Sequence, residues 1–377
     1  MISVLSIDWL SLFCTCPLGH FGGNAESALR YRWKYKKREY GTPAFKEVYD
    51  IYLGRLRVCD VQCEPRNGLM RKDAILVKFA NAVLYRRDLF DLVDAFLDNH
   101  LLEVHNITRL DLCCDFNELL YGQPDRLIVD FLNSVLRHKG RGRGTAYFVH
   151  YNKGEKGGSV QRLVYNGLSF GSHTSDVRVY MYNKTWELLC EKDKPYIRDT
   201  WKAAGLDTAI PVWRIEVSLK SDGMKFVDKD RGYQGRVTLE DVRNEQRRKE
   251  LYFSYVRKYF SFVRNDHPIS NITREPLIPL IAGEGMAFNL GLLREVGCSN
   301  QADKVFVKAL HTAVQRYPFA ELDADLLKVV EEEVAHSVDL TEWRLRHVQE
   351  WNEPYEYNDK VADLERHEYI NHYDLGI

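Results

Sequence analysis

Short runs of β-branched and aromatic residues, separated by turn-forming residues, recur through the first 221 residues of the chain and predict strands. These runs lie at residues 3–14, 48–61, 74–85, 107–116, 145–152, 160–166, 176–183 and 212–221. Apolar residues with a helical period predict helices at 86–101 and 124–140, the second of which begins with proline and ends with glycine. The residues after 184 have a broken helical pattern.

The pattern becomes mainly helical after residue 237. Residues 239–265 form one long amphipathic stretch, and the prolines at 267–279 indicate a linker with further helices beyond it. We therefore predict an α+β fold with two parts. Residues 1–265 form an antiparallel or mixed β-sheet body covered by helices on one face, and residues 266–377 form a small helical C-terminal region with an acidic tail.

Three of the predicted strands each have one apolar face and one polar face, because residues two apart on a strand point to the same side. The polar faces carry Arg109, Asp111, Cys113 and Asp115 on the first strand, Arg178, Tyr180, Tyr182 and Lys184 at the second, and Arg214, Glu216 and Ser218 on the third. A tyrosine between two cations is a suitable nucleophile for phosphoryl transfer. The three polar faces together therefore suggest a reactive site.

If the three strands belong to one sheet, Asp111, Asp115 and Glu216 converge. Carboxylate oxygens are the ligands that Mg²⁺ and Mn²⁺ prefer, and such an ion would neutralise a scissile phosphate. Tyr182 would then attack phosphorus and form a phosphotyrosine ester. Free tyrosine ionises near pH ~10, so activation must come from the metal, from a nearby base or from one of three cations: Arg178, Lys184 or Arg214. The alternative is that these side chains form cross-strand salt bridges on a solvated face.

Four segments, in this order, resemble the replication-initiation proteins of pT181-type rolling-circle plasmids, a family that includes related phage initiators and MobT-like relaxases. The segments are SIDWLSLF at 6–13, ITRLDLCCDF at 107–116, FGSHTSDVRVYMYNK at 170–184 and VWRIEVSLK at 212–220. The family pattern is roughly a TRxDxxxDF strand, a GSxxSxxxxRxYxK segment and a WRxE strand. The resemblance extends over about residues 2–265.

The resemblance implies a DNA endonuclease and strand transferase that uses a tyrosine and a divalent metal at an origin. The matched positions are the tyrosine of the YxK element, its flanking cations, and the acids of the first and last motifs: Tyr182, Arg178 and Lys184, Asp111 and Asp115, and Glu216. Tyr180 shares a face with Tyr182 and stays open as an alternative nucleophile. His173 departs from the family, which has a basic or another polar residue there.

Two basic segments are candidates for contacts with DNA. RYRWKYKKREY at 30–40 mixes cations with aromatic rings, and RHKGRGRG at 137–144 is a glycine-rich loop. Cations contact phosphates without regard to sequence, and aromatic rings stack on unpaired bases. The candidate residues are Arg30, Arg32, Trp33, Lys34, Lys36, Lys37, Arg137, Lys139, Arg141 and Arg143. Either segment could equally be a solvated face or a mobile turn.

The net charge of −1 hides an asymmetry along the chain. From Glu321 onward there are 16 acidic residues and 5 Lys or Arg, so this tail has a net charge of −11 and the first 320 residues have +10. A basic body with an acidic tail suits a protein that binds a polyanion such as DNA. A solvated acidic helix without such a role accounts for the tail equally well.

The other patterns narrow the choice of function. No apolar run reaches the ~18 residues of a membrane span. The eight cysteines indicate reduced thiols in the cytoplasm. The glycines at 283–291 lack the lysine of a phosphate-binding loop, so they do not indicate a site of nucleotide hydrolysis. We predict a cytoplasmic rolling-circle replication initiator that acts on a single-stranded or hairpin DNA origin. Its partners would be a host helicase and polymerase and a second copy in a homodimer. The alternatives are a conjugative relaxase of MobT type and a non-catalytic DNA-binding regulator of replication.

Overall fold

The computed structural model of the 377-residue chain describes most residues up to 293. The described residues are 2–16, 21, 32–66, 70–139, 144–155, 158–172, 174–190, 193–265 and 276–293, with the backbone alone from 146 to 164. The helices predicted beyond residue 293 and the acidic tail lie outside these residues. The boundary between two parts at residue 265 stays a prediction.

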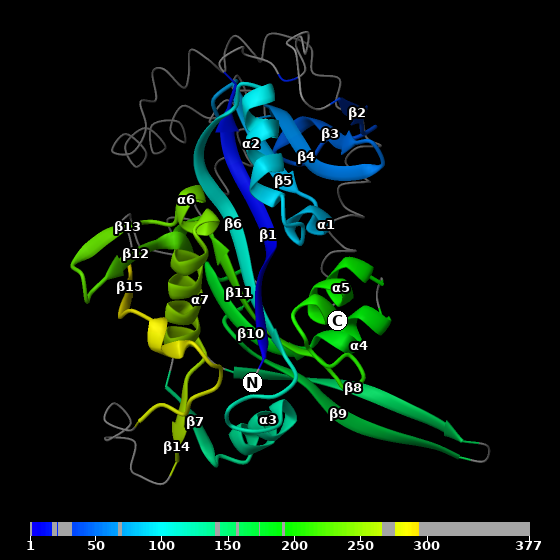
Figure 1. Cartoon of the computed structure of the whole chain (residues 1–377), viewed down its shortest axis with the longest axis vertical. Coiled ribbons are helices and arrows are strands. Elements are labelled where there is room, and N and C mark those ends of the chain that lie inside the picture. The colour runs from blue at the N-terminus through cyan, green and yellow to red at the C-terminus, as the bar shows by residue number, and fades with distance from the viewer. Residues whose placement is uncertain are drawn as a thin grey trace, which may run out of the picture. The chain divides into compact units, whose positions relative to one another are not determined.

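Ten strands of the described residues form one sheet, whose central pairings are antiparallel (Figure 1). In order across the sheet they are β2 (Trp33–Lys37), β3 (Phe45–Leu53), β4 (Leu56–Pro65), β5 (Ala74–Phe79), β1 (Ser3–Thr15), β6 (Glu103–Phe116), β11 (Trp213–Lys220), β10 (Val177–Asn183), β9 (Gly158–Phe170) and β8 (Gly144–Glu155). The predicted α+β class with a large antiparallel sheet is confirmed.

Two smaller sheets and short helices complete the described structure. β7 (Leu136–His138) pairs with β14 (Phe262–Arg264), and β12 (Lys225–Asp228) lies between β13 (Tyr233–Arg236) and β15 (Leu290–Leu292). The helices are α1 (Asn81–Leu84), α2 (Leu89–Asn99), α3 (Pro124–Leu132), α4 (Lys184–Cys190), α5 (Pro195–Ala203), α6 (Leu239–Arg243) and α7 (Glu245–Tyr259), with 3₁₀ turns η1 (Ser221–Met224) and η3 (Glu284–Met286).

The chain divides into two compact units. The larger one comprises Met1–Lys37, Tyr49–Val61 and Ile75–Arg294, and the described residues of the smaller one lie within Arg38–Val48 and Gln62–Ala74. In the smaller unit, the backbone N–H of Arg66 donates to the carbonyl of Ala44 at 3.0 Å. All residues of the site described below belong to the larger unit.

The register of β6, β11 and β10 places their polar residues on one face. Arg214 lies opposite Asp115 on one side and Tyr182 on the other, and Glu216 lies opposite Tyr180. Residues two apart on a strand share a face, so in this register the polar residues of the three strands lie on one face and the apolar residues lie on the reverse face. The three polar faces recognised in the sequence therefore form one continuous surface.

A β-bulge in β1 adds an acidic residue to this surface. The register of β1 against β6 shifts between Ile7 and Trp9, so Asp8 is the extra residue. After Ile7, strict alternation sends Asp8 to the polar face and would return Trp9 to the core, but the bulge keeps Trp9 on the polar face as well. Ile7 remains in the core, Trp9 lies opposite Asp111 on the polar face, and the carboxylate of Asp8 also reaches the polar face.

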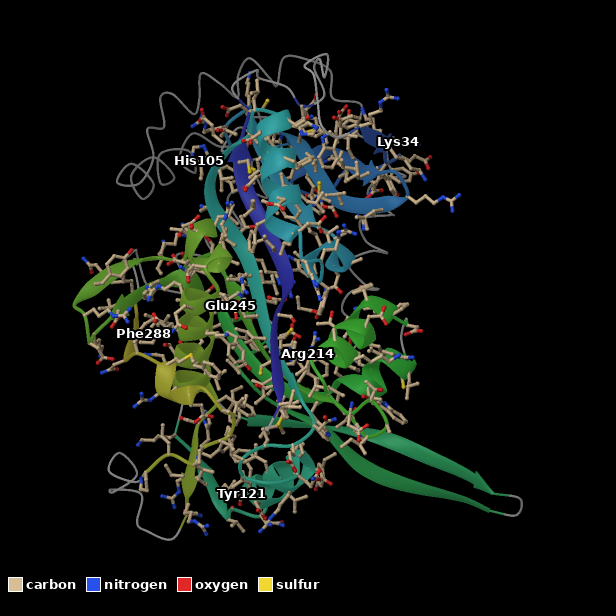
Figure 2. All side chains as sticks on the ribbon, in the orientation of Figure 1. Lys34, His105, Tyr121, Arg214, Glu245 and Phe288 are labelled. Atoms are coloured by element: carbon tan, nitrogen blue, oxygen red, sulfur yellow. The ribbon has the colours of Figure 1, made fainter. Side chains whose placement is uncertain are left out.

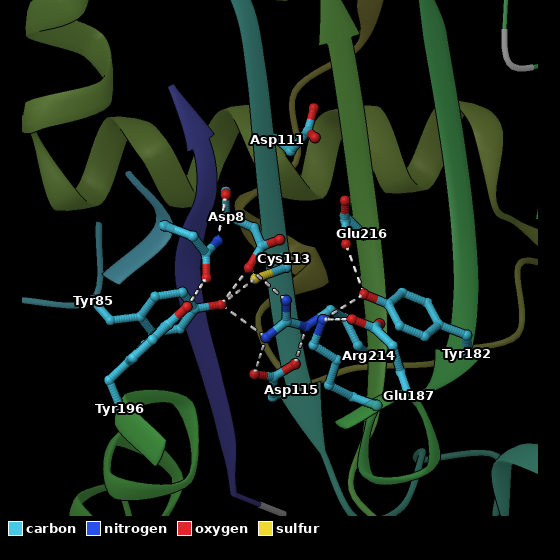
Figure 3. Close-up of polar contacts among 12 residues, drawn as sticks. Asp8, Tyr85, Asp111, Cys113, Asp115, Tyr182, Glu187, Tyr196, Arg214 and Glu216 are labelled. Atoms are coloured by element: carbon cyan, nitrogen blue, oxygen red, sulfur yellow. Dashed lines mark hydrogen bonds and ion pairs between the residues drawn. The ribbon is translucent and has the colours of Figure 1, made fainter. Parts of the chain in front are cut away.

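Helix α7 covers the apolar face of the sheet. The buried Tyr252 hydroxyl donates to the carbonyl of Ile215 in β11 at 3.0 Å, and Leu251 and Val256 of the same helix are buried. In Figure 3 this helix crosses behind the strands, on the side opposite the polar side chains. α7 is separated from α6 by Asn244, whose extended backbone ends α6 and whose side chain accepts from the N–H of Arg247 to cap α7. The single helix predicted over 239–265 is thus two helices followed by β14.

At one end of the polar face, α5 closes the site. Trp201 and Ile197 of α5 are buried in a small core with Leu188 of α4, and Val4 and Tyr85 pack against that core. The indole N–H of Trp201 donates to Asp115 at 2.7 Å. Burial of each large apolar side chain contributes about 1.5–3 kcal/mol, so this core fixes α5 against the sheet.

Two predicted elements end earlier than the sequence pattern indicated. The strand predicted to run to residue 85 ends at Phe79, and α1 follows at once, beginning at Asn81. The helix predicted over 124–140 ends at Leu132, because Ser134 has a positive φ of 60° and a helix does not continue through that conformation. β7 occupies the rest of that segment.

The seven cysteines in the described ranges are free thiols, and six of them are buried. None of the helices in the described ranges has the length and apolar character to span a membrane.

Gly167 allows β9 to approach the tyrosine strand closely, and this gives a test of the local packing. A Cβ at this position would lie 2.6 Å from the carbonyl oxygen of Met181 and 3.2 Å from the Cβ of Tyr182. We expect Gly167→Ala to lower the free energy of unfolding by roughly 1–3 kcal/mol, as overpacking does, in urea denaturation. Gly285→Ala is the control, since no atom lies within 4 Å of its added Cβ. Equal stability of the two variants would contradict the close approach.

Candidate active site

Two tyrosines and one glutamate form the centre of the polar face. The Tyr182 hydroxyl donates to Glu216 Oε2 at 2.9 Å, and the Tyr180 hydroxyl donates to Glu216 Oε1. The tyrosine rings stack with 5.3 Å between centroids and 17° between planes. Glu216 is 3% exposed, whereas both tyrosines are half-buried. The carboxylate is thus shielded from solvent, and each of its oxygens accepts from one phenol.

Lys184 brings a buried cation to Tyr182. Asn183 ends β10 and accepts from the N–H of Trp186 at 2.9 Å, which starts α4 at Lys184. The Lys184 ammonium donates to the Tyr182 hydroxyl at 3.2 Å and to Glu187 at 2.6 Å. A lysine at a helix N-terminus opposes the helix dipole, so its burial here depends on Glu187.

Arg214 is fully buried beside the tyrosines and binds carboxylates from two strands (Figure 3). Its Nε and Nη2 donate to the two oxygens of Asp115 at 2.6 and 2.8 Å, and its Nη1 donates to Asp8 at 2.8 Å. Nη2 also donates to the Tyr85 hydroxyl at 2.9 Å. Burial would raise the pKa of Asp8, but the charges of Arg214 and Lys184 outweigh it and hold that pKa below its ordinary value.

Further along the same face, Asp111 is paired with a neighbouring arginine. Arg109 Nε and Nη2 donate to both oxygens of Asp111 at 3.1 and 2.6 Å, and the Ser218 hydroxyl donates to it at 2.7 Å. The Arg109 guanidinium lies 4.0 Å from the Trp9 ring centroid, and the Lys78 ammonium lies 3.8 Å from it. Cations and an aromatic ring therefore continue the polar face beyond the tyrosines.

The acid–base state of the centre follows from burial. Desolvation, with the charges of Asp8 and Asp111, raises the pKa of Glu216 to about 7. Desolvation, with the charge of Glu216, raises the pKa values of Tyr180 and Tyr182 well above that of free tyrosine. Both phenols are therefore protonated at rest, and Glu216 changes its charge near neutral pH.

The predicted metal ligands do not come together as one set. Asp115 is engaged by Arg214 and Trp201, and no three acidic, His or Cys side chains of the described residues are placed to hold an ion. Burial raises the pKa values of Asp111 and Glu216, and the charge of Asp8 adds to both shifts, whereas Arg214 holds the pKa of Asp8 itself below its ordinary value. Asp111 and Glu216 are hard oxygen donors of the kind that Mg²⁺ and Mn²⁺ prefer. The ligand roles predicted for Asp111, Asp115 and Glu216 stay predictions.

The predicted cations of the site differ in what they contact. Lys184 contacts the Tyr182 hydroxyl, whereas the Arg178 guanidinium lies over the Tyr180 ring, 4.5 Å from its centroid. Arg214 lies opposite Tyr182 in the register, but its hydrogen bonds go to Asp8, Asp115 and Tyr85.

The predicted DNA-binding residues of β2 lie away from this centre (Figure 2). β2 is at the edge of the sheet, five strand positions from β6, which is roughly 24 Å at about 4.8 Å per strand. Figure 2 shows Lys34 on this edge, well away from Arg214. Arg32, Lys34, Lys36 and Lys37 are exposed, Trp33 packs edge-on against Phe96, and Arg137 and Lys139 are half-buried at β7 and just after it. Arg30, Arg141, Arg143 and His173 lie outside the described residues.

Sequence reasoning missed several residues of the site. Asp8 was read as part of an ordinary strand, and only its interruption of an apolar run signalled it. Tyr85 was placed at the end of a strand, although it follows α1. Glu187 and Trp201 belong to the segment read as a broken helix, and neither carried a motif.

Comparisons with known proteins give a structural neighbour but no family. No model of a known protein family matches the chain, and no curated protein matches its sequence. Among solved structures, the chain is similar to "Structure of Rolling Circle Replication Initiator Protein from Geobacillus stearothermophilus", with 15% sequence identity and a TM-score of 0.41. The match covers 73% of this chain and 92% of that chain.

The raised pKa of Glu216 has a measurable consequence for stability. The folded state keeps the Glu216 proton up to about pH 7, whereas an unfolded glutamate loses it near pH ~4.3, so this group makes folding less favourable as the pH rises between the two values. Glu216→Gln removes this dependence. We expect the stability of the variant relative to the native protein to increase by on the order of 3 kcal/mol between about pH 5 and about pH 8.

The measurement is urea denaturation of both proteins, without divalent metal, across this pH range. A constant offset between the two stabilities at every pH would contradict the raised pKa.

Proposed function

We propose that this protein nicks one strand of DNA at a replication origin, with Tyr182 as the nucleophile, and remains joined to the 5′ phosphate. The observation that carries the proposal is the contact set of the Tyr182 hydroxyl, with Glu216 at 2.9 Å and Lys184 at 3.2 Å. A nucleophile needs a proton acceptor and a charge that stabilises its ionised form, and these two residues supply both.

Glu216 acts as the proton acceptor. The best general base has a pKa near the working pH, and burial raises the pKa of Glu216 to about 7. Because burial also raises the pKa of Tyr182, its proton is transferred during the attack and not before it. Lys184 stabilises the negative charge that develops on the phenol oxygen.

The reaction exchanges one ester for another. The Tyr182 oxygen forms a bond to phosphorus, the bond between phosphorus and the 3′ oxygen breaks, and the proton held by Glu216 passes to that 3′ oxygen. The 3′ hydroxyl is then free for extension by a host polymerase. The assignment to rolling-circle replication is supported by the ordered motifs at 107–116, 170–184 and 212–220.

The polar face supplies cations to the DNA backbone near this centre. Arg109 and Lys78 lie about the Trp9 ring, and Arg178 lies over the Tyr180 ring. Cations offset the phosphate charge, and an aromatic ring can stack on an unpaired base. The exposed lysines of β2 lie farther out and would bind flanking DNA.

We also propose that a divalent cation binds at Glu216, with Asp111 as a second carboxylate ligand. When bound, it supplies positive charge that polarises the scissile phosphate. It also offsets the charge of Glu216, which accepts no hydrogen bond from an arginine or lysine among the described residues.

The first test is nicking of a negatively supercoiled plasmid that carries the gene and its flanking DNA, in the presence of Mn²⁺. We expect the native protein to relax it, and Tyr182→Phe to lower the rate by at least about 100-fold, since the nucleophile is lost. Tyr233→Phe is the matched control, because Tyr233 is half exposed on β13 and remote in sequence from the motifs.

Absence of nicking by the native protein would leave a non-catalytic DNA-binding role. Nicking that persists in Tyr182→Phe and is lost in Tyr180→Phe would assign the first attack to Tyr180.

The metal proposal is tested by thermal stability without DNA. A ligand at a hundred times its Kd stabilises the folded state by about 2.7 kcal/mol, so saturating Mn²⁺ should raise the Tm of the native protein by several degrees. The rise should be lost in Asp111→Asn and kept in Asp88→Asn, a carboxylate that pairs with Arg86 at the surface. An equal rise in both variants would place the ion elsewhere.

A further inference from the structure

Tyr180 has the same relation to Glu216 as Tyr182, and the first nick makes no use of it. Each phenol donates to a different oxygen of the one carboxylate. Tyr180 lies directly opposite Glu216 in the register, and Tyr182 reaches it diagonally from the next position. Both rings are half-buried and nearly parallel.

Each tyrosine also has a cation of its own, two residues away along the chain. Lys184 contacts the hydroxyl of Tyr182, and Arg178 lies over the ring of Tyr180. A tyrosine kept only for packing on this face would need neither a buried carboxylate nor a cation. A single hydrogen bond from Tyr182 would also be enough to orient Glu216 for one nucleophile.

We propose that Tyr180 is a second nucleophile, so that one chain carries out two successive strand transfers around the shared carboxylate of Glu216. This inference rests on the proposed nicking function. Tyr182 attacks first, because its hydroxyl, and not that of Tyr180, accepts a hydrogen bond from Lys184 among the described residues. Tyr180 attacks the second scissile phosphate while the first strand end is still esterified to Tyr182.

The two steps balance in atoms and protons. In the second step, the Tyr180 oxygen bonds to phosphorus, the bond from that phosphorus to its 3′ oxygen breaks, and a new 3′ hydroxyl is released. This hydroxyl attacks the phosphorus on Tyr182, which joins the DNA ends and releases the Tyr182 phenol. No oxidant, nucleotide or water is consumed.

Glu216 can serve both steps because each step restores it. It accepts a proton from the attacking phenol and returns that proton to the departing oxygen, so it is again a carboxylate when the second phenol attacks. The two oxygens of the carboxylate face different tyrosines, and no side chain needs to move between the steps to bring base and nucleophile together.

The experiment uses the full chain and a single-stranded DNA that contains two copies of the sequence around the nick, once that position has been mapped on the nicked plasmid. Joining of the segment between the copies gives a closed circle and leaves the downstream strand attached to Tyr180, whereas reaction that stops after the first step leaves DNA attached to Tyr182. Trypsin cleaves after Arg178 and Lys184, so both tyrosines lie in the peptide VYMYNK, residues 179–184. Fragmentation of this peptide by mass spectrometry shows which tyrosine holds the nucleotide.

We expect the native protein to yield adducts on both tyrosines together with closed circles. In Tyr180→Phe the adduct remains on Tyr182, and the ratio of circles to adduct falls at least about tenfold. Tyr233→Phe retains the native ratio.

Three outcomes separate the two proposals. Adducts on Tyr182 alone in the native protein, or a native ratio of circles in Tyr180→Phe, would overturn the second nucleophile and leave the nicking function intact. The second of these results would assign the second cleavage to water or to Tyr182 of another copy. Absence of any adduct in the native protein would overturn the nicking function itself.

Discussion

The buried guanidinium of Arg214 is the interaction on which the centre of this sheet depends. It joins β11 to β6 through Asp115 and to β1 through Asp8, and its fourth contact is the Tyr85 hydroxyl after α1. Removal of one partner from such a buried pair leaves an uncompensated charge at a cost of about 3–5 kcal/mol. Arg214 therefore fixes the relative positions of the strands from which the reactive side chains project.

The ion pairs of Arg214 and Arg109 leave one carboxylate of the polar face without a paired cation. Arg214 neutralises Asp115 and lowers the pKa of Asp8, and Arg109 binds Asp111 with two hydrogen bonds. Glu216 receives hydrogen bonds from two phenols but no direct contact from a cation among the described residues. Burial, with the charges of Asp8 and Asp111, therefore raises the pKa of Glu216 to about 7. A carboxylate in that state can accept a proton from a neighbouring phenol.

Alternation along the strands predicted the shared face but not the partners within it. The period of two placed Asp111, Asp115 and Glu216 on the polar side, and the register of β6 with β11 agrees with this. Alternation could not show that Arg214 forms an ion pair with Asp115, since cross-strand pairing depends on the register of the strands and on which cation is more deeply buried. It also missed Asp8, because the preceding positions on the same face of β1, Val4 and Ser6, carry no charge that would mark a polar face. Tyr85 and Trp201 come from helices whose positions depend on tertiary packing.

The spacing of the two tyrosines explains why a strand suits this site better than a helix. Residues two apart on a strand point to the same side and lie roughly 7 Å apart at about 3.4 Å per residue, which brings both rings to one carboxylate on the neighbouring strand. On a helix, residues two apart point to different sides. β10 therefore presents Arg178, Tyr180 and Tyr182 as a row, and the cap at Asn183 turns Lys184 inward at its end. The close approach of β9 at Gly167 supports this row from the other side, so the direction of both phenols is set by backbone pairing on both flanks of β10.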